Sequence, residues 1–292
     1  KGATMYPQME NFEPANWKQG NLPFLENHTR SDLLDQFDKN GVLLFKNFLP
    51  EELIYDTGKE WDKFHESDRE SLPKNDEPLV VFWRHIMGEK KKLQPLSKFP
   101  SISKLVYHKD ILKLVKSLAR NNEIRLLETI IFNKPAQKSN YLNWHQDVAY
   151  FPFDPNNQIA VWLPLDVVDQ ENGVMEYVIG SHKKGLMGST NLHTQEPFDG
   201  EDRPIIPKKP EDQGFSIKAA CSRPGDLVVH HGFTWHRSAP NYSKTRQRRG
   251  LSLRYLVGQT KFKPRAGSAT TFIGQVEVQP GDTIEGKPFP LL

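Results

Sequence analysis

Two H-x-D triplets are the pattern in this chain best suited to binding a metal ion. One runs from His145 to Asp147 and the other from His108 to Asp110. Positions i and i+2 of an extended chain share a face, so His145 and Asp147, which follow the strand-like segment 141–144, can contact one ion. The other triplet lies at the start of a predicted helix, where i and i+2 point about 200° apart. We therefore interpret His108 and Asp110 as a helix start with a surface histidine.

A third metal ligand must come from elsewhere in the chain. His236 is favoured because it follows the strand-like run 227–230. Together with His145 and Asp147 it would complete a triad of two histidines and one carboxylate. Such a triad occupies one face of an iron(II) octahedron and leaves three positions open.

Other histidines in the second half of the chain have simpler interpretations. His182 lies in a Gly-Ser-His turn, where a structural hydrogen bond is expected. His230 and His231 are adjacent, so at most one of them faces the interior, where we expect it to pack or to support a ligand. His193 is a further candidate in a polar segment.

Composition excludes several classes of protein. The 292 residues include 39 Lys and Arg against 36 Asp and Glu, and a net charge of +3 argues against a dedicated nucleic-acid binder. The single cysteine, Cys221, excludes an intrachain disulfide and a four-cysteine metal site. There is no apolar run of roughly 20 residues, and residues 1–10 lack a secretory pattern. These features predict a soluble, cytoplasmic protein. Phosphate-loop, dinucleotide-binding, zinc-protease and serine-nucleophile motifs are also missing.

The first third of the chain predicts helices around one short strand. Ser31 or Asp32 is expected to cap a helix that Gly41 ends, and Pro50 is expected to open the next. Apolar residues recur at helical spacing in three segments. The predicted elements are a helix over 31–40, a buried strand over 42–45, a helix over 50–64 and a helix over 111–118.

Beyond about residue 122, short strand-like runs alternate with turn residues. The expected strands are 124–132, 158–165, 174–178, 226–230 and 250–256. Many short strands without long intervening helices predict a mainly β fold of the sandwich or barrel type. Residues 183–218 are polar, rich in proline and without a period. We expect an irregular arm over 1–30 and a single domain over 31–292, with a helical N-terminal layer supporting a C-terminal jelly roll.

Seven short motifs occur in order in this part of the chain: 145–147 (HQD), 162–166 (WLPLD), 171–173 (ENG), 180–182 (GSH), 224–226 (PGD), 236–238 (HRS) and 248–252 (RRGLS). In this order and spacing they resemble the phytanoyl-CoA dioxygenase family of iron(II)/2-oxoglutarate oxygenases. The resemblance covers most of residues 31–260. It implies a double-stranded β-helix (a cupin-like jelly roll) and iron(II) held by His145, Asp147 and His236. It further implies that 2-oxoglutarate and dioxygen occupy the open positions.

The resemblance also implies an arginine that clamps the distal carboxylate of 2-oxoglutarate. Arg248 shares a strand face with Gly250 and Ser252, as in the family pattern, whereas Arg249 shares its face with bulkier leucines. We therefore assign the clamp to Arg248. One extra residue in the preceding loop leaves Arg249 as the alternative.

Further residues match family positions around the cosubstrate. Trp162 and Ser238 match residues that contact it, and Thr129 lies where the family has a residue lining it. Arg84 and His85 lie near the position of a family lysine. Three aromatic residues after the HQD motif would line or cover the substrate side of the metal, with a core patch as the alternative: Tyr150, Phe151 and Phe153.

The implied activity is hydroxylation of an unactivated C–H bond with release of succinate and carbon dioxide. Lysines and arginines in 73–98 and 183–218 favour a small anionic or zwitterionic metabolite as substrate. Three alternatives stay open: an acyl-CoA hydroxylase of the same family, a jelly-roll binding module without turnover, and a zinc hydrolase. The complete set of His145, Asp147, His236 and Arg248 argues against the last two, because neither needs a carboxylate clamp.

Overall fold

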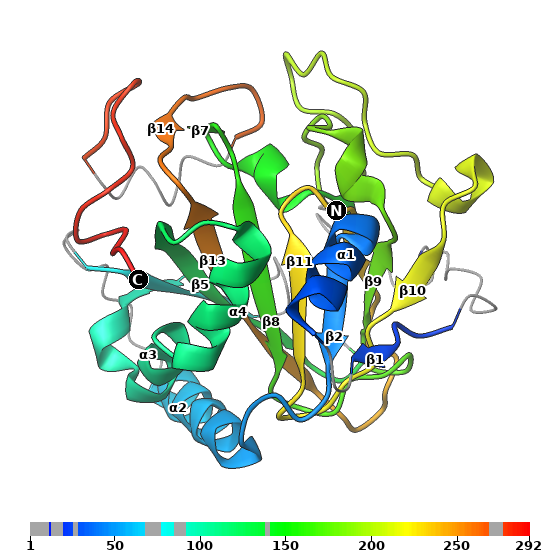
Figure 1. Ribbon diagram of the computed structural model, residues 1–292. Coiled ribbons are helices and arrows are strands. Elements are labelled where there is room, and N and C mark those ends of the chain that lie inside the picture. The colour runs from blue at the N-terminus through cyan, green and yellow to red at the C-terminus, as the bar shows by residue number, and fades with distance from the viewer. Residues whose placement is uncertain are drawn as a thin grey trace, which may run out of the picture.

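Two β-sheets form the framework of the protein (Figure 1). The computed structural model describes residues 12, 20–25, 29–67, 77–84, 92–137, 141–268 and 277–292. The larger sheet, here the main sheet, has the order β1 (Phe24–Leu25), β2 (Val42–Phe45), β11 (Leu227–His231), β8 (Gln158–Pro164), β13 (Arg248–Val257), β5 (Ile124–Lys134), β3 (Leu79–Arg84) and β4 (Lys92–Pro95). The smaller one, the minor sheet, has the order β10 (Ile217–Ala219), β9 (Met175–Val178), β12 (His236–Ser238) and β6 (Leu142–His145). A short pair joins β7 (Phe153–Asp154) to β14 (Lys261–Phe262).

Helices cover one face of the main sheet, here its outer face (Figure 1). The helices are α1 (Arg30–Asn40), α2 (Glu51–Ser67), α3 (Pro100–Val106) and α4 (Lys109–Ala119). Their apolar residues pack on alternate residues of the strands, such as Leu251 and Leu253 of β13 and Val161 of β8. Because side chains alternate across a strand, the intervening residues face the other way. These intervening residues form the inner face of the main sheet and contact the minor sheet. Trp162 and Val228, for example, pack with Tyr177.

Local sequence explains where the first helix begins and ends. Thr29, and neither Ser31 nor Asp32, is the cap residue. Its side chain accepts a hydrogen bond from the Asp32 backbone, and the Asp32 carboxylate accepts one from the Thr29 backbone, so the two residues form a capping box. Asp32 is thus the third helical residue rather than the cap. Gly41 ends the helix in the left-handed conformation at φ 74°, as predicted.

The predicted jelly roll with N-terminal helices is confirmed, and the structure adds detail that the sequence pattern lacked. Strands β3 and β4 extend the main sheet, with β3 parallel to β5. The segment 183–218 is not featureless, because it contains a short helix at Pro210–Gln213 and the start of β10. Within residues 1–30, Phe24–Leu25 pairs with β2. The division into an arm and a single domain stays a prediction. Among the described residues, no helix has the length and apolar character needed to cross a bilayer.

Gly250 of β13 leaves room on the inner face for the ring of Trp162. A Cβ atom at position 250 would lie 2.2 Å from Cζ2 of Trp162. We therefore expect Gly250→Ala to lower the free energy of unfolding by about 1–3 kcal/mol through overpacking. Chemical denaturation measures the change.

Gly58→Ala is the matched control, because a Cβ there meets nothing closer than 3.5 Å and lies in α2. It should leave stability unchanged or raise it by about 0.5–1 kcal/mol. Equal stability of Gly250→Ala and the wild type would contradict the packing described.

Candidate metal centre

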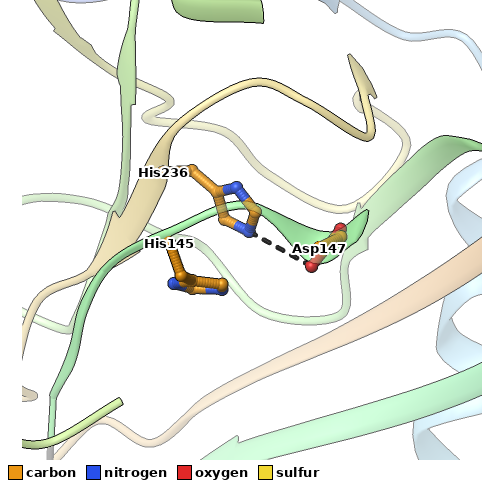
Figure 2. Close-up of side chains that lie close together, drawn as sticks. All are labelled: His145, Asp147 and His236. Atoms are coloured by element: carbon orange, nitrogen blue, oxygen red, sulfur yellow. Dashed lines mark ion pairs between the residues drawn. The ribbon is translucent and has the colours of Figure 1, made fainter. Parts of the chain in front are cut away.

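Three side chains converge between the two sheets (Figure 2). His145 ends β6, Asp147 begins the short helix η4 (Asp147–Tyr150), and His236 begins β12. His145 and His236 are direct partners in the antiparallel pairing of β6 with β12, and their ring centroids lie 4.2 Å apart. Asp147 Oδ1 lies 3.6 Å from His236 Nε2. Each residue has one potential ligand atom within 4.8 Å of the others, so the three could hold a single ion.

Backbone carbonyls fix the tautomer of both histidines. His145 Nδ1 donates to the Asn143 carbonyl at 2.7 Å, and His236 Nδ1 donates to the Thr234 carbonyl at 3.0 Å. With the proton on Nδ1, the Nε2 lone pair of each ring is available to a metal. Burial lowers the pKa of both histidines, so both are neutral at pH 7.

The Asp147 carboxylate is buried and has a polar partner on each oxygen. Arg254 Nη2 donates to Oδ1 at 2.8 Å, and His230 Nε2 donates to Oδ2 at 3.1 Å. Burial acts to raise the pKa of Asp147, but the charge of Arg254 and the nearby imidazoles hold it well below the usual range. Asp147 is therefore an anionic ligand candidate.

Arg248 lies on the inner face of the main sheet, at the start of β13. It is 1% exposed, and its Nη2 donates to Ser238 Oγ at 3.1 Å and to the Gly173 carbonyl at 2.7 Å. Its guanidinium carbon lies 5.2 Å from the ring centroid of Trp162. The buried Trp162 Nε1 has no hydrogen-bond acceptor among the described residues. These groups form a donor-rich site suited to a carboxylate.

Arg249, the alternative clamp, points to the outer face. Its guanidinium donates to both carboxylate oxygens of Asp166 and, through Nη1, to Asp62 Oδ1 of α2 at 2.8 Å. Those partners satisfy its charge away from the three converging side chains. The structure therefore brings Arg248, and not Arg249, to the inner face.

Thr129 is not brought to the site. Its register partners are Leu253 and Val80, which both belong to the helix-covered core, and its hydroxyl donates to the Leu79 carbonyl at 3.0 Å. The next residue, Ile130, faces the opposite side of the sheet, which is the inner face. The predicted position was therefore wrong by one residue. His85 and the side chain of Arg84 lie outside the described residues.

The three aromatic residues after the HQD motif divide into two groups. Tyr150 packs edge-on against His145 with centroids 6.1 Å apart, and its hydroxyl donates to the Thr190 carbonyl. Phe151 and Phe153 are buried in an apolar cluster with β5 and β14. Tyr150 thus covers a ligand, while the two phenylalanines form the predicted alternative, a core patch.

The remaining histidines lie where simpler roles were predicted. His230 is buried beside Asp147, whereas His231 on the opposite face packs 6.2 Å from Phe37. His182 Nε2 donates to the Asp38 carbonyl at 3.1 Å, which is a structural bond. His108 Nδ1 caps α4 by accepting from the Asp110 backbone.

Sequence reasoning missed several residues that shape the site. Tyr177 stacks on His236 at 5.8 Å between ring centroids, and Gln146, between the two ligands of the HQD motif, ties them to a loop. Glu128 and Arg254 form a buried ion pair beside Asp147. Arg254 could have been predicted, because its even spacing from Arg248 places both side chains on the same face of β13.

Comparison with known proteins identifies the family that the chain matches. A family described as "Phytanoyl-CoA dioxygenase (PhyH)" matches residues 37–250. A protein of Stutzerimonas stutzeri named "Probable alpha-ketoglutarate-dependent hypophosphite dioxygenase" is 30% identical over 153 residues, which is 51% of each chain. Human peroxisomal phytanoyl-CoA dioxygenase is 26% identical over 221 residues, 70% of this chain and 62% of the human one. The chain thus spans about half to two thirds of the length of these relatives.

Solved structures share the fold. The non-heme alpha-ketoglutarate-dependent carbocyclase SnoK from nogalamycin biosynthesis aligns with a TM-score of 0.68 at 22% identity, covering 92% of this chain and 100% of SnoK. The epimerase SnoN, solved with Fe3+ and alpha-ketoglutarate, aligns with a TM-score of 0.64 at 18% identity, covering 90% and 98%.

Gln146 anchors the loop that follows β9 to the ligand segment. Its side chain is fully buried, donates to the carbonyls of Gly185 and Phe233, and accepts from the Met187 backbone. Gln146→Ala leaves these groups unpaired, and we expect the free energy of unfolding to fall by about 1–3 kcal/mol. Limited proteolysis should also cut residues 183–218 faster than in the wild type.

The exposed Gln170 provides the control, since Gln170→Ala should change neither measurement. Unchanged stability and proteolysis of Gln146→Ala would show that the loop is held by other contacts.

Proposed function

The chain belongs to the phytanoyl-CoA dioxygenase family, and from this premise we propose that it is an iron(II)- and 2-oxoglutarate-dependent dioxygenase. Its proposed reaction is hydroxylation of a C–H bond in a small anionic or zwitterionic metabolite. The observation that supports it most directly is the convergence of His145, Asp147 and His236 within 4.8 Å, with both Nε2 atoms free.

The donor set fits a ferrous ion. Two neutral imidazoles and one carboxylate are the ligands of non-haem iron(II) oxygenases, and this set leaves coordination positions open for other molecules. When bound, iron and 2-oxoglutarate would activate dioxygen, the oxidant, so that one of its oxygen atoms enters the substrate as hydroxyl and the other enters succinate as carbon dioxide is released. The protein holds the ligands in one tautomer and one orientation. We expect Tyr150, which packs against the His145 ring, and the loop anchored by Gln146 to limit access of water to the three ligands.

The inner-face donors fit the distal carboxylate of 2-oxoglutarate. Arg248 and Ser238 already share a hydrogen bond, and Trp162 Nε1 is a buried donor in need of an acceptor. Burial lowers the pKa of Arg248 to about 10, so its guanidinium is still charged at pH 7. A carboxylate placed here would gain a charge-assisted hydrogen bond in a site of low dielectric constant.

A cationic group adjoining the ligand segment supports a small anionic or zwitterionic substrate. Arg265 Nη2 donates to the carbonyls of Val148 and Ala149, directly after Asp147. Burial and the neighbouring Arg203 lower its pKa to about 10, which leaves it charged at neutral pH. The name of the Stutzerimonas relative contains a small anion, hypophosphite, which agrees with this proposal. The name of the human relative instead favours a second candidate substrate, an acyl-CoA.

Binding of the cosubstrate can be tested without turnover. Iron(II) and 2-oxoglutarate added under anaerobic conditions should produce a visible metal-to-ligand charge-transfer band. Asp147→Ala should lose the band, because one of three ligands is gone. Arg248→Gln should weaken 2-oxoglutarate binding tenfold or more, since it removes the charged partner of the distal carboxylate.

Arg249→Gln is the matched control in the same strand and should bind 2-oxoglutarate as the wild type does. If the wild-type protein gives no band, or if Arg249→Gln loses affinity while Arg248→Gln does not, the proposed assignment is wrong.

The substrate class can be tested by measuring succinate formation. Small phosphonates and amino acids should raise the rate of succinate formation above the uncoupled rate, and fatty acyl-CoA thioesters should not. For a stimulating anion, Arg265→Gln should raise KM several-fold with a smaller change in kcat, because it removes a positive charge next to the segment that carries Asp147. Stimulation by acyl-CoA alone would favour the second candidate.

A further inference from the structure

A row of residues crosses the inner face of the main sheet beneath Asp147. It consists of His230 on β11, Ala160 on β8, Arg254 on β13 and Glu128 on β5. The strands lie side by side in this order, and Ala160 is the register partner of both His230 and Arg254. Arg254 is in turn the register partner of Glu128. Neighbouring strands lie about 4.8 Å apart, so His230 and Arg254 are separated by roughly the width of two strands.

The Asp147 carboxylate bridges the gap between His230 and Arg254. Its Oδ1 accepts from Arg254 Nη2 at 2.8 Å and its Oδ2 accepts from His230 Nε2 at 3.1 Å. Ala160, the residue between them, has a side chain of only one methyl group and is buried. Because two donors from different strands bind different oxygens, the carboxylate can neither rotate nor withdraw without breaking a bond.

Each donor is itself held in place. His230 Nδ1 accepts from the Tyr177 hydroxyl at 3.4 Å, which leaves Nε2 as the donor to Asp147. Arg254 Nη1 donates to Glu128 Oε1, and the Glu128 side chain is 3% exposed. A change of register in the β5–β13 pairing lies between Arg254 and Tyr255. The pairing is regular from Arg248 to Arg254, and this regular register places Glu128 opposite Arg254.

We propose that Arg254 and His230 are positioning residues for Asp147, and that Glu128 acts through Arg254. They set the orientation of the carboxylate before the metal binds and do not themselves contact iron. The role rests on the proposed function, because it concerns a ligand of the proposed ferrous ion. These three residues are thus the groups that orient the Asp147 carboxylate toward the ion.

Removal of Arg254 would have two consequences. Asp147 would lose the donor to Oδ1, and two buried carboxylates, Asp147 and Glu128, would lose the cation that they share. The loss of partners that orient a metal ligand typically lowers metal affinity 10- to 100-fold. Both effects act on the protein before any substrate is present, so they can be measured without catalysis.

The test is the affinity of the apoprotein for Co(II), measured by equilibrium dialysis and by the visible spectrum of the bound ion. We expect Arg254→Gln to bind Co(II) at least tenfold more weakly than the wild type, and Arg254→Lys, which keeps the charge, to lose less. Arg249→Gln, which breaks a comparable ion pair on the outer face of the same strand, should bind within twofold of the wild type. Thermal unfolding of each variant reports any general loss of stability.

Ala160→Val provides a second test that removes neither charge nor donor. The larger side chain occupies the space beneath Asp147, so Co(II) binding should weaken tenfold or more even if Arg254→Gln does not fold. Binding of Co(II) within twofold of the wild type by Ala160→Val, or by folded Arg254→Gln, would overturn the positioning role. A wild-type protein that binds no Co(II) would instead overturn the metal site of the proposed function, and the positioning role with it.

Discussion

The antiparallel pairing of β6 with β12 is the constraint on which the site depends. It places His145 directly opposite His236, although the two are far apart in the chain. Direct cross-strand partners present their side chains on the same face, so one pairing register delivers two imidazoles to one point. A slip of one residue would turn one ring to the other face of the minor sheet. The HQD segment, which continues from β6, then contributes Asp147, and the main sheet contributes Arg248.

The interior of this protein contains more charge than a simple core would tolerate. Asp147, Glu128, Arg254 and Arg248 are all buried or nearly so. A buried charge is unfavourable unless it is paired and hydrogen-bonded. Asp147, Arg254 and Glu128 satisfy one another as a chain of ion pairs, whereas Arg248 is held by a carbonyl, a hydroxyl and an aromatic ring. The first group holds two carboxylates on one guanidinium and so retains a negative charge. The hydrogen-bond partners of Arg248 are uncharged, which leaves its positive charge for the proposed carboxylate of 2-oxoglutarate.

The sequence predicted the three converging side chains and the strand face of Arg248 because these residues follow strand alternation. His145 and Asp147 share a face at spacing two, and the parity of Arg248 with Gly250 separates it from Arg249. Prediction from sequence failed where the position of a residue depends on the register between two strands. Thr129 missed the inner face by one residue, and Glu128 looks like a lone acid in an apolar run until β5 is paired with β13. The cap of α1 was displaced to Thr29 because three neighbouring polar residues could each cap a helix, and only the position of the first turn decides among them.

A crystal structure of the protein loaded with Mn(II) and 2-oxoglutarate, using the anomalous signal of the metal, tests the central claim most directly. The account predicts one metal bound by Nε2 of His145, Nε2 of His236 and a carboxylate oxygen of Asp147. It also predicts the distal carboxylate of 2-oxoglutarate on the guanidinium of Arg248. A metal at any other place, or a cosubstrate that leaves Arg248 without contact, would contradict it.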